Sequence, residues 1–361
     1  MNSSLRPTKA FSERLLDWHA RHGRHDLPWQ NTRDPYRIWL SEIMLQQTQV
    51  DTVIPYYERF LLRFPDLASL ASAPLDDVLG LWSGLGYYAR ARNLHKAAQA
   101  VMSEHDGSFP QDAETIATLP GIGRSTAAAI AAFAFGQRGA ILDGNVKRVL
   151  CRHQGVEGYP GERVVESRLW DLAEALLPKN VECIGRYIQA QMDLGATLCT
   201  RGRPACGRCP VAEDCVAQAS GRTSELPAAR PRKAVPKREA RMAVIRSELG
   251  FLLERRPPNG IWGGLLSLPE LPGADATEDA GWLTRSCGIE ARTSTTLEPL
   301  EHVFSHFRLT IRPTLFEAQP TQGVAEDRFA WIPFESLDIA GLPAPVRTIL
   351  KRITRRPIPD S

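Results

Sequence analysis

The sequence lacks any apolar run long enough to cross a membrane, and its opening residues, MNSSLRPTKA, lack the apolar core of a signal peptide. We therefore expect no membrane contact and a protein that works in the cytoplasm. A strong charge of either sign is also missing, because 44 Lys and Arg against 41 Asp and Glu leave a net charge of only +3. The positive charge is local: residues 201–241 hold ten Lys or Arg and four Asp or Glu. Such a segment fits either a polyanionic partner or a solvated linker.

The chain of 361 residues is longer than one ordinary core needs, so we expect two domains. Apolar residues spaced three and four apart predict helices over residues 8–220. After residue 240 the residue pattern changes and predicts strands, with one helix near 275–286. The basic, proline-containing stretch between them has neither pattern. We predict an all-helical domain, a linker and an α+β domain, at residues 1–221, 222–240 and 241–361.

One stretch organises the helical part. The residues LPGIGRSTAAAI form a turn with Gly121 and Gly123 that leads directly into an Ala-rich helix. Unpaired backbone N–H groups and the positive end of a helix dipole make such a turn a site for a phosphate of a nucleic-acid backbone. The alternative is that the glycines only end a helix, as most such turns do.

Two carboxylates are candidates for catalysis. Asp143 precedes Gly144 and Asn145 where the next helix starts, so it is either a plain helix cap or a catalyst that also caps. Glu42 lies among the apolar residues Trp39 and Ile43, and removal from water would raise its pKa, as a general acid near neutral pH requires. Periodicity alone favours the alternative, a solvated Glu42 on the outer face of its helix.

A second glycine-rich turn carries Tyr87 and Tyr88 and continues into a helix with several cations. Aromatic rings beside cations suit nucleic acid, because the rings stack on or wedge between bases while the cations meet phosphates. Tyrosines fill protein cores equally well, so both interpretations stand.

Four closely spaced cysteines give the strongest chemical signal. Cys199, Cys206, Cys209 and Cys215 have the spacing C-x6-C-x2-C-x5-C, and both a zinc ion and a cubane iron–sulfur cluster take four thiolates. The presence of one C-x2-C pair rather than two favours the cluster. Disulfides are less favoured, since nothing indicates an oxidising compartment. The remaining cysteines are expected to be reduced and structural; they are Cys151, Cys183 and Cys287.

With these motifs in order, the chain resembles the adenine DNA glycosylases of the MutY family, within the helix-hairpin-helix superfamily that includes endonuclease III. The segments that carry the resemblance are LPWQ with WLSEIMLQQTQV, GLGYYARARNLH, LPGIGRSTAAAI with LDGNVKRVL, the cysteine loop, and HVFSHF. The resemblance implies a [4Fe-4S] cofactor on the four cysteines. It also implies removal of adenine mispaired with 8-oxoguanine or guanine, by flipping the base out of double-stranded DNA.

The resemblance assigns roles to the catalytic motifs. Glu42 matches the acid that protonates the leaving adenine, and Asp143 matches the carboxylate that stabilises the positive charge on the sugar. We expect Glu42 to be protonated in a dry pocket, Asp143 to be ionised at a helix N-terminus, and Asn145 to position Asp143. In endonuclease III relatives a lysine at position 125 forms a Schiff base and cuts the strand. Because this position is Ser125, we predict a monofunctional enzyme.

The resemblance also implies a DNA-binding set. Gln47 and Tyr87 match residues that wedge into the duplex, with Leu45 and Leu85 as apolar support. Lys147 is expected to contact a phosphate. The backbone N–H groups of the hairpin are expected to do the same, at Gly121, Gly123 and Ser125.

The second domain resembles a Nudix fold with a broken hydrolase signature. Gly264 and Glu270 keep its first part, but the acidic helix motif reads EDAGWL at residues 278–283. We expect the domain to recognise 8-oxoguanine instead, with the recognition loop Phe304, Ser305 and His306. Without the resemblance, FSHF reads as a buried strand.

Several alternatives compete with this interpretation. They are an endonuclease III-like glycosylase with lyase activity, a non-enzyme that uses the cluster for DNA binding or redox sensing, and a Nudix hydrolase of oxidised nucleotides. The expected partner is double-stranded DNA with A:8-oxoguanine or A:G mispairs. We further expect a monomer, with a contact to another repair protein at the linker.

Overall fold

The computed structural model describes residues 9–231, 235–257, 260–272, 276–304, 306–320, 328–337 and 340–354. The chain folds into two compact units. The first contains residues 1–72 and 96–232, and the second contains residues 73–95 and 233–361. No helix in the described ranges is long and apolar enough to span a membrane.

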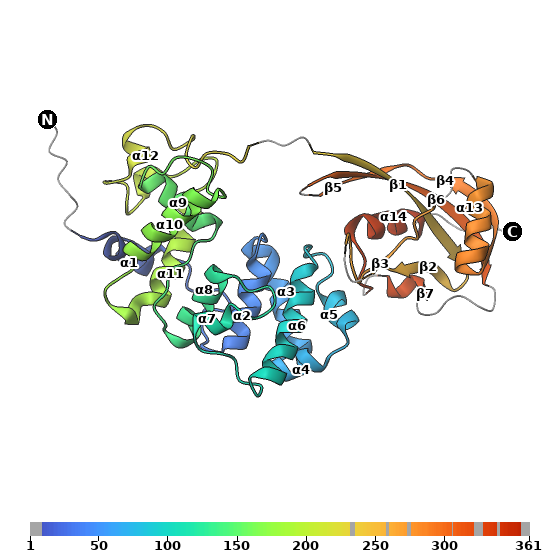
Figure 1. Cartoon of the computed structure of the whole chain (residues 1–361), viewed down its shortest axis with the longest axis horizontal. Helices are drawn as coiled ribbons and strands as arrows, with labels where there is room; N and C mark the ends of the chain where they lie inside the picture. Colours follow the sequence, from blue (N-terminus) through green and yellow to red (C-terminus); the bar gives the residue numbers. More distant parts are fainter. Residues whose placement is uncertain are drawn as a thin grey trace. The chain divides into compact units, whose positions relative to one another are not determined.

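The first unit is helical, as the spacing of its apolar residues predicts (Figure 1). Its helices are α1 (Phe11–His22), α2 (Pro35–Leu45), α3 (Val50–Arg63), α4 (Leu67–Ser72), α7 (Ala113–Ile116), α8 (Arg124–Phe135), α9 (Gly144–His153), α10 (Arg163–Ala175), α11 (Ile184–Asp193) and α12 (Val216–Ala219). Helix α5 (Leu75–Leu81) belongs to the second unit, and α6 (Ala89–Glu104) begins there and ends in the first.

One core joins α1, α8, α9, α10 and α11. The Ala-rich α8 contributes Ala128, Ala129 and Ala132, whose small side chains let the neighbouring helices approach closely. Leu150 and Tyr187, both fully buried, fill the centre from α9 and α11. This packing fixes the N-terminal ends of α8 and α9, where the hairpin and Asp143 lie.

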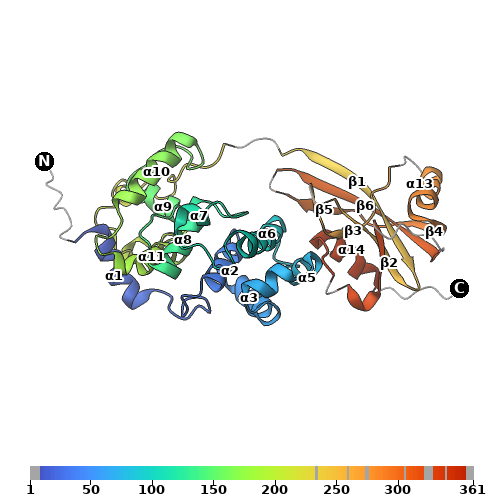
Figure 2. The same ribbon diagram turned by 60° about the horizontal axis from the view of Figure 1, so that its bottom comes forward.

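The second unit contains a mixed sheet (Figure 2). Its strands are β1 (Lys237–Ser247), β2 (Gly250–Arg255), β3 (Leu266–Ser267), β4 (Ile289–Thr296), β5 (Leu300–Val303), β6 (Arg308–Pro320) and β7 (Phe329–Ile332). The order along the sheet is β3-β2-β1-β6-β4, with β5 paired to β6 and β7 paired to β2. Strands β1 and β6 run parallel, from Lys237 opposite Arg308 to Arg246 opposite Glu317, and the other pairs are antiparallel.

Both faces of this sheet are covered. Successive side chains of β1 point to opposite faces, and each set packs against other elements. Met242 and Val244 pack on one face with helix α14 (Ala344–Thr354), while Ala243 and Ile245 pack on the other with the segment after helix α13 (Ala276–Trp282). The expected α+β fold is therefore present, and α13 confirms the helix predicted near residues 275–286. The structure adds β4, β7 and α14, which the sequence analysis did not identify.

The expected linker, residues 222–240, is partly ordered. Strand β1 begins at Lys237, inside the linker, because its backbone pairs with β6. At the other end Leu226 is buried, and its carbonyl accepts a hydrogen bond of 2.8 Å from the buried Arg152 Nε. The segment next to the cysteine loop is thus packed on the helical unit. The three remaining cysteines, Cys151, Cys183 and Cys287, are free and buried, as expected.

Candidate active site

Asp143 is the N-cap of α9. Its Oδ1 accepts a hydrogen bond of 2.7 Å from the Val146 backbone N–H, which satisfies one of the unpaired donors at the helix start. The residue before it, Leu142, donates its N–H to Ser125 Oγ at 2.9 Å. The Ser125 hydroxyl therefore ties the first turn of α8 to the loop that presents Asp143.

Glu42 lies on α2, which starts at an Asp34 cap with Pro35 in its first turn and packs on α8. Its neighbours Trp39 and Ile43 are buried, whereas Glu42 itself is half-buried and lines a pocket. The alternative of a solvated Glu42 on the outer face is therefore wrong.

The two carboxyl groups differ in their surroundings. Burial, and then the nearby negative charge of Asp143, raise the pKa of Glu42 to about 8. Burial also raises the pKa of Asp143, but backbone N–H groups of Val146 and Asn145 oppose that shift, and so do nearby cations. Glu42 thus has the raised pKa expected of an acid. The ionised state of Asp143 stays a prediction, since burial acts against it while the helix N-terminus favours it.

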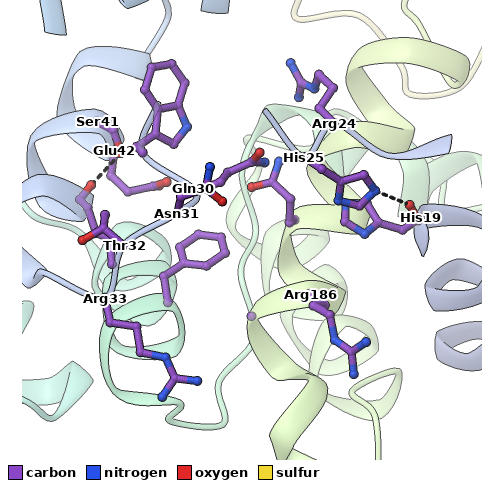
Figure 3. Close-up of a pocket in the computed structure, with 15 residues that line it drawn as sticks. His19, Arg24, His25, Gln30, Asn31, Thr32, Arg33, Ser41, Glu42 and Arg186 are labelled. Atoms are coloured by element: carbon purple, nitrogen blue, oxygen red, sulfur yellow. Dashed lines mark hydrogen bonds between the residues drawn. The ribbon is translucent and has the colours of Figure 1, made fainter. Parts of the chain in front are cut away.

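The pocket beside Glu42 has a volume of about 330 Å³. Figure 3 shows the Glu42 side chain extending toward Gln30 and Asn31, with His19, Arg24 and His25 on the far side. The other lining residues are Trp29, Thr32, Arg33, Ile38, Ser41, Phe133, Gly185, Arg186 and Gln189. Sequence reasoning missed this set; its one signal was the motif LPWQ, which contains Trp29 and Gln30.

A buried ionic network fixes the far wall of the pocket. Asp193 is fully buried and accepts hydrogen bonds from Arg24 Nη2 at 2.6 Å and from Gln189 Nε2 at 2.9 Å. Burial opposes its charge, yet His19, whose Nε2 lies 3.4 Å from Asp193 Oδ2, and the hydrogen bonds from Arg24 lower the pKa of Asp193. The paired charge holds the loop after α1 against α11.

The hairpin before α8 has the geometry of a phosphate site. Gly121 has a left-handed φ of +79°, which favours glycine, and Gly123 is the N-cap of α8 with no side-chain cap. A Cβ added at Gly123 would have nothing within 4 Å. Gly123 and Arg124 are exposed, so an anion can approach the N-terminus of α8.

The cysteine loop is joined to the catalytic motif through Arg148. Its Nε donates to the Cys199 carbonyl at 2.7 Å, and its Nη2 donates to Asn145 Oδ1 and to the Gly195 carbonyl, both at 2.8 Å. Gly195 packs directly on Asn145, since an added Cβ would lie 2.5 Å from Asn145 Cβ. Asn145 is thus held in place from two sides.

The four cysteines of the loop converge. The Cys209 thiol lies close enough to Cys199, Cys206 and Cys215 for each of them to raise its pKa electrostatically. Within the described ranges, no three His, Cys, Asp or Glu side chains are placed to hold a single metal ion. A cubane cluster binds each thiolate on a different iron, so its ligands lie farther apart than those of one zinc ion. The donor set fits a [4Fe-4S] cluster.

Both residues predicted to wedge into DNA have left-handed backbones. Gln47 has a φ of +57° at the end of α2, and Tyr87 has a φ of +49° with 54% of its side chain exposed. Non-glycine residues rarely adopt this conformation, and strained backbone concentrates at functional sites. Leu85 is buried, as expected of apolar support, whereas Leu45 is half-buried.

Lys147 has a protein partner. Its Nζ lies 2.6 Å from Glu166 Oε1 on α10, so its charge is already compensated in the absence of DNA. The predicted phosphate contact would require Lys147 to leave or share that carboxylate.

The recognition loop follows β5, which ends at Val303. Phe304 stacks on Phe307 with ring centroids 4.3 Å apart, and its N–H donates to the Phe307 carbonyl at 2.9 Å. His306 packs edge-on against the same ring, while Ser305 lies outside the described residues. The segment is therefore a tight loop with an aromatic base, and the alternative of a buried strand through FSHF is wrong.

Acidic residues near the broken Nudix signature are paired with arginines. Asp279 on α13 is buried and bonded to Arg241, and Glu254 on β2 lies 2.9 Å from Arg328. Arg256 lies 3.8 Å from Glu270. These carboxylates are engaged in ion pairs.

Relatives of the chain cover nearly its whole length. An adenine DNA glycosylase of Buchnera aphidicola subsp. Acyrthosiphon pisum is 37% identical over 347 residues, which are 96% of this chain and 98% of that protein. The human adenine DNA glycosylase is 35% identical over 408 residues, covering 96% of this chain and 73% of that protein. The chain belongs to the adenine DNA glycosylase family.

Family models divide the chain as the motifs do. The model of the HhH-GPD superfamily base excision DNA repair proteins matches residues 40–175, and the NUDIX domain model matches residues 241–352. The iron–sulfur binding domain of endonuclease III matches residues 199–215. Membership makes the chain a hydrolase of N-glycosyl bonds in base-excision repair, with an iron–sulfur cluster as its cofactor.

Solved structures agree with the fold of an adenine DNA glycosylase. A thermostable thymine-DNA glycosylase is 30% identical with a TM-score of 0.53, covering 58% of this chain and 95% of that chain. An endonuclease III–DNA complex shares the fold, with a TM-score of 0.50 at 20% identity over 58% of this chain and 94% of that chain.

Proposed function

We propose that this adenine DNA glycosylase removes adenine opposite 8-oxoguanine or guanine in double-stranded DNA and leaves the strand intact at an abasic site. The observation that carries the proposal is the pocket beside Glu42, whose raised pKa of about 8 keeps the carboxyl protonated at neutral pH. A flipped base is the guest that such a pocket suits, because the glycosidic bond is hidden in duplex DNA.

Glu42 acts as the general acid. A proton delivered from its carboxyl to N7 of adenine turns the base into a neutral leaving group, so the bond to the sugar breaks without expelling an anion. Desolvation keeps the proton on Glu42 near neutral pH, so the carboxyl is in its acid form and available to donate when the glycosidic bond breaks. Trp29 and Gln30 line the same pocket and are placed to hold the base.

Asp143 faces the positive charge that develops on the deoxyribose. An anion close to an oxocarbenium-like sugar stabilises the transition state, and the helix N-terminus helps to keep that anion charged. Asn145 positions this motif, since Arg148 holds its side chain. When bound, the [4Fe-4S] cluster cross-links the loop of residues 199–215, whose Cys199 carbonyl anchors Arg148.

The strand stays intact because the hairpin has no amine to attack the sugar. Ser125 occupies the position of the lyase lysine, and its hydroxyl accepts the Leu142 N–H. Lys147, the nearest alternative amine in the motif, is paired with Glu166. A Schiff base needs a free amine at the sugar.

The second unit recognises the base that is paired with adenine. Phe304 and His306 form part of a tight aromatic loop rather than a hydrolase site, and the acidic residues near the Nudix motif are ion-paired. We therefore assign 8-oxoguanine recognition to this loop and no nucleotide hydrolysis to the domain. We further propose that the enzyme is a monomer and that its linker contacts another repair protein.

The test is single-turnover excision with wild-type protein on duplexes that carry adenine opposite 8-oxoguanine, guanine or thymine. We expect rapid loss of adenine opposite 8-oxoguanine, slower loss opposite guanine, none opposite thymine, and strand breaks only after alkali. An Asp143→Asn variant should lose activity. Breaks without alkali, above all on oxidised pyrimidines, would establish the lyase alternative. Magnesium-dependent release of phosphate from oxidised nucleotides would establish the Nudix alternative.

A further inference from the structure

The segment with the wedge residue Tyr87 is bonded to the unit that contains the recognition loop. Residues 73–95 form one compact unit with residues 233–361. On α6, which follows Tyr87, Arg92 donates from Nη1 to the Gly263 carbonyl at 2.6 Å. This half-buried guanidinium thus meets the turn of residues 260–264.

The turn has little freedom to move away from α5 and α6. Trp262 has a left-handed φ of +58°, and Gly264 has a φ of +75°. A Cβ added at Gly264 would touch Leu79 Cδ1 at 3.8 Å and Arg92 Cδ at 3.9 Å. The turn is therefore packed against both helices, and Arg92 supplies its hydrogen bond there.

The same turn packs against the recognition loop through the Trp262 ring. The Trp262 ring lies 5.7 Å from Phe304 and 6.2 Å from His302, measured between ring centroids. His302 in turn meets Phe304 edge-on at 4.6 Å. A continuous series of contacts therefore runs from Arg92 through Gly263 and Trp262 to Phe304.

We propose that Arg92 is a positioning residue for reading the base opposite adenine: it fixes the Trp262 turn, and through it the Phe304 loop, relative to the helix that follows Tyr87. The proposal rests on the proposed function, because it assigns Arg92 to the discrimination between 8-oxoguanine and guanine. Arg92 acts through Trp262 and does not touch the reacting atoms.

Other bonds keep the segment attached when Arg92 is replaced. Arg255 makes two hydrogen bonds to the Asp76 carboxylate, at 2.7 and 2.8 Å, and Tyr88 Oη donates to the Leu342 carbonyl at 3.0 Å. Arg347 Nη2 donates to Ser83 Oγ at 2.7 Å. An Arg92 variant should therefore fold and lose only the support of the turn.

The experiment compares Arg92→Met, which keeps the apolar stem, with Arg92→Lys, which keeps a donor for the Gly263 carbonyl. The readout is the ratio of single-turnover rates for adenine opposite 8-oxoguanine and opposite guanine. We expect Arg92→Met to lower this ratio about tenfold, the effect of losing a charged hydrogen bond, and Arg92→Lys to restore part of it. Lys96→Met, which removes an exposed cation from the same helix, should leave the ratio unchanged.

Two results would overturn the proposal. One is an equal fall of both rates in Arg92→Met, which indicates general damage to DNA binding; the other is an unchanged ratio. Trp262→Phe should lower the rate ratio as well. Expressed as free energies, the effect of the double variant Arg92→Met with Trp262→Phe should be smaller than the sum of the two single effects.

A binding measurement separates this proposal from the proposed function. Duplexes that pair 8-oxoguanine or guanine with a 2′-fluorinated deoxyadenosine, which resists excision, give a ratio of dissociation constants for each variant. If the wild-type protein does not excise adenine, the proposed function is refuted. A lower preference of Arg92→Met for binding the 8-oxoguanine duplex would even then support the positioning role. An unchanged binding preference in Arg92→Met contradicts that role, as an unchanged rate ratio does.

Discussion

Arg148 Nη2 donates a hydrogen bond of 2.8 Å to Asn145 Oδ1, while the Nε of the same guanidinium binds the carbonyl of Cys199 at 2.7 Å. One side chain therefore links a cluster ligand to the motif that presents Asp143. Because Arg148 fills both acceptors at once, the order of the cysteine loop and the position of Asn145 depend on each other.

Replacement of Arg148 by Met should lower the rate of adenine excision about tenfold or more, since Asn145 and the Cys199 carbonyl lose a charged donor. The protein should keep its cluster, because the four cysteines are unchanged. Single-turnover kinetics and the visible absorption of the cluster measure the two effects separately. Arg168→Met, on the exposed side of α10, is the matched control and should behave as wild type. An unchanged rate in Arg148→Met contradicts the link.

Replacement of Ser125 by Lys should introduce strand cleavage without alkali. Position 125 is bonded to Leu142, the residue before Asp143, so an amine there reaches the site where the sugar reacts. Loss of the hydroxyl should also cost about 1 kcal/mol of stability, which Ser125→Ala measures alone. Borohydride trapping of a protein–DNA adduct checks the chemistry. If Ser125→Lys excises adenine but traps no adduct, position 125 does not decide between the two reaction types.

Replacement of Gly123 by Ala should weaken DNA binding without destabilising the fold. The backbone at Gly123 (φ −94°, ψ 169°) suits alanine, and the new methyl group would meet nothing within 4 Å. Its free energy of unfolding should stay equal or rise by about 0.5 kcal/mol. The methyl group would instead obstruct a phosphate at the start of α8. Fluorescence anisotropy with duplex DNA measures the affinity, and urea unfolding measures the free energy of unfolding. Unchanged affinity would refute a phosphate site at this hairpin.

The raised pKa of Glu42 predicts how stability depends on pH. Since the folded-state pKa of about 8 exceeds the ordinary value of 4.5, the contribution of Glu42 to stability is full below pH 4.5 and is lost as pH rises toward 8. Glu42→Gln has no such proton to lose. The stability of the variant relative to wild type should therefore increase between pH 4.5 and 8, as urea unfolding at several pH values measures. A constant difference over that range would mean that Glu42 has an ordinary pKa.

Much of the site could be predicted because its main residues lie in short local motifs. Asp143 combines a helix cap with a glycine turn, and the four cysteines lie in one loop, so neighbouring residues define these features. Glu42 needed more than local pattern. Periodicity allowed an exposed position, and only the packing of α2 on α8 places it in a pocket.

The pocket itself could not be predicted from sequence. Its wall combines the loop after α1 with α11, joined by Arg24 and Asp193, and these residues meet only when the two helices pack. The grouping of residues 73–95 with the second unit is equally non-local, since it depends on single contacts such as Arg92 with Gly263. Strand β4, rich in Thr and Ser at its end, carries no clear alternation of apolar residues.

The most direct test of the account is the pH dependence of single-turnover adenine excision opposite 8-oxoguanine, measured for wild type and Glu42→Gln. We predict a wild-type rate that falls as pH rises through about 8, the pKa of Glu42. The variant should be slower by a factor of about 100 or more and should lack that fall, because its amide has no proton to deliver. A wild-type rate independent of pH up to 9, or a variant as fast as wild type, would contradict Glu42 as the acid.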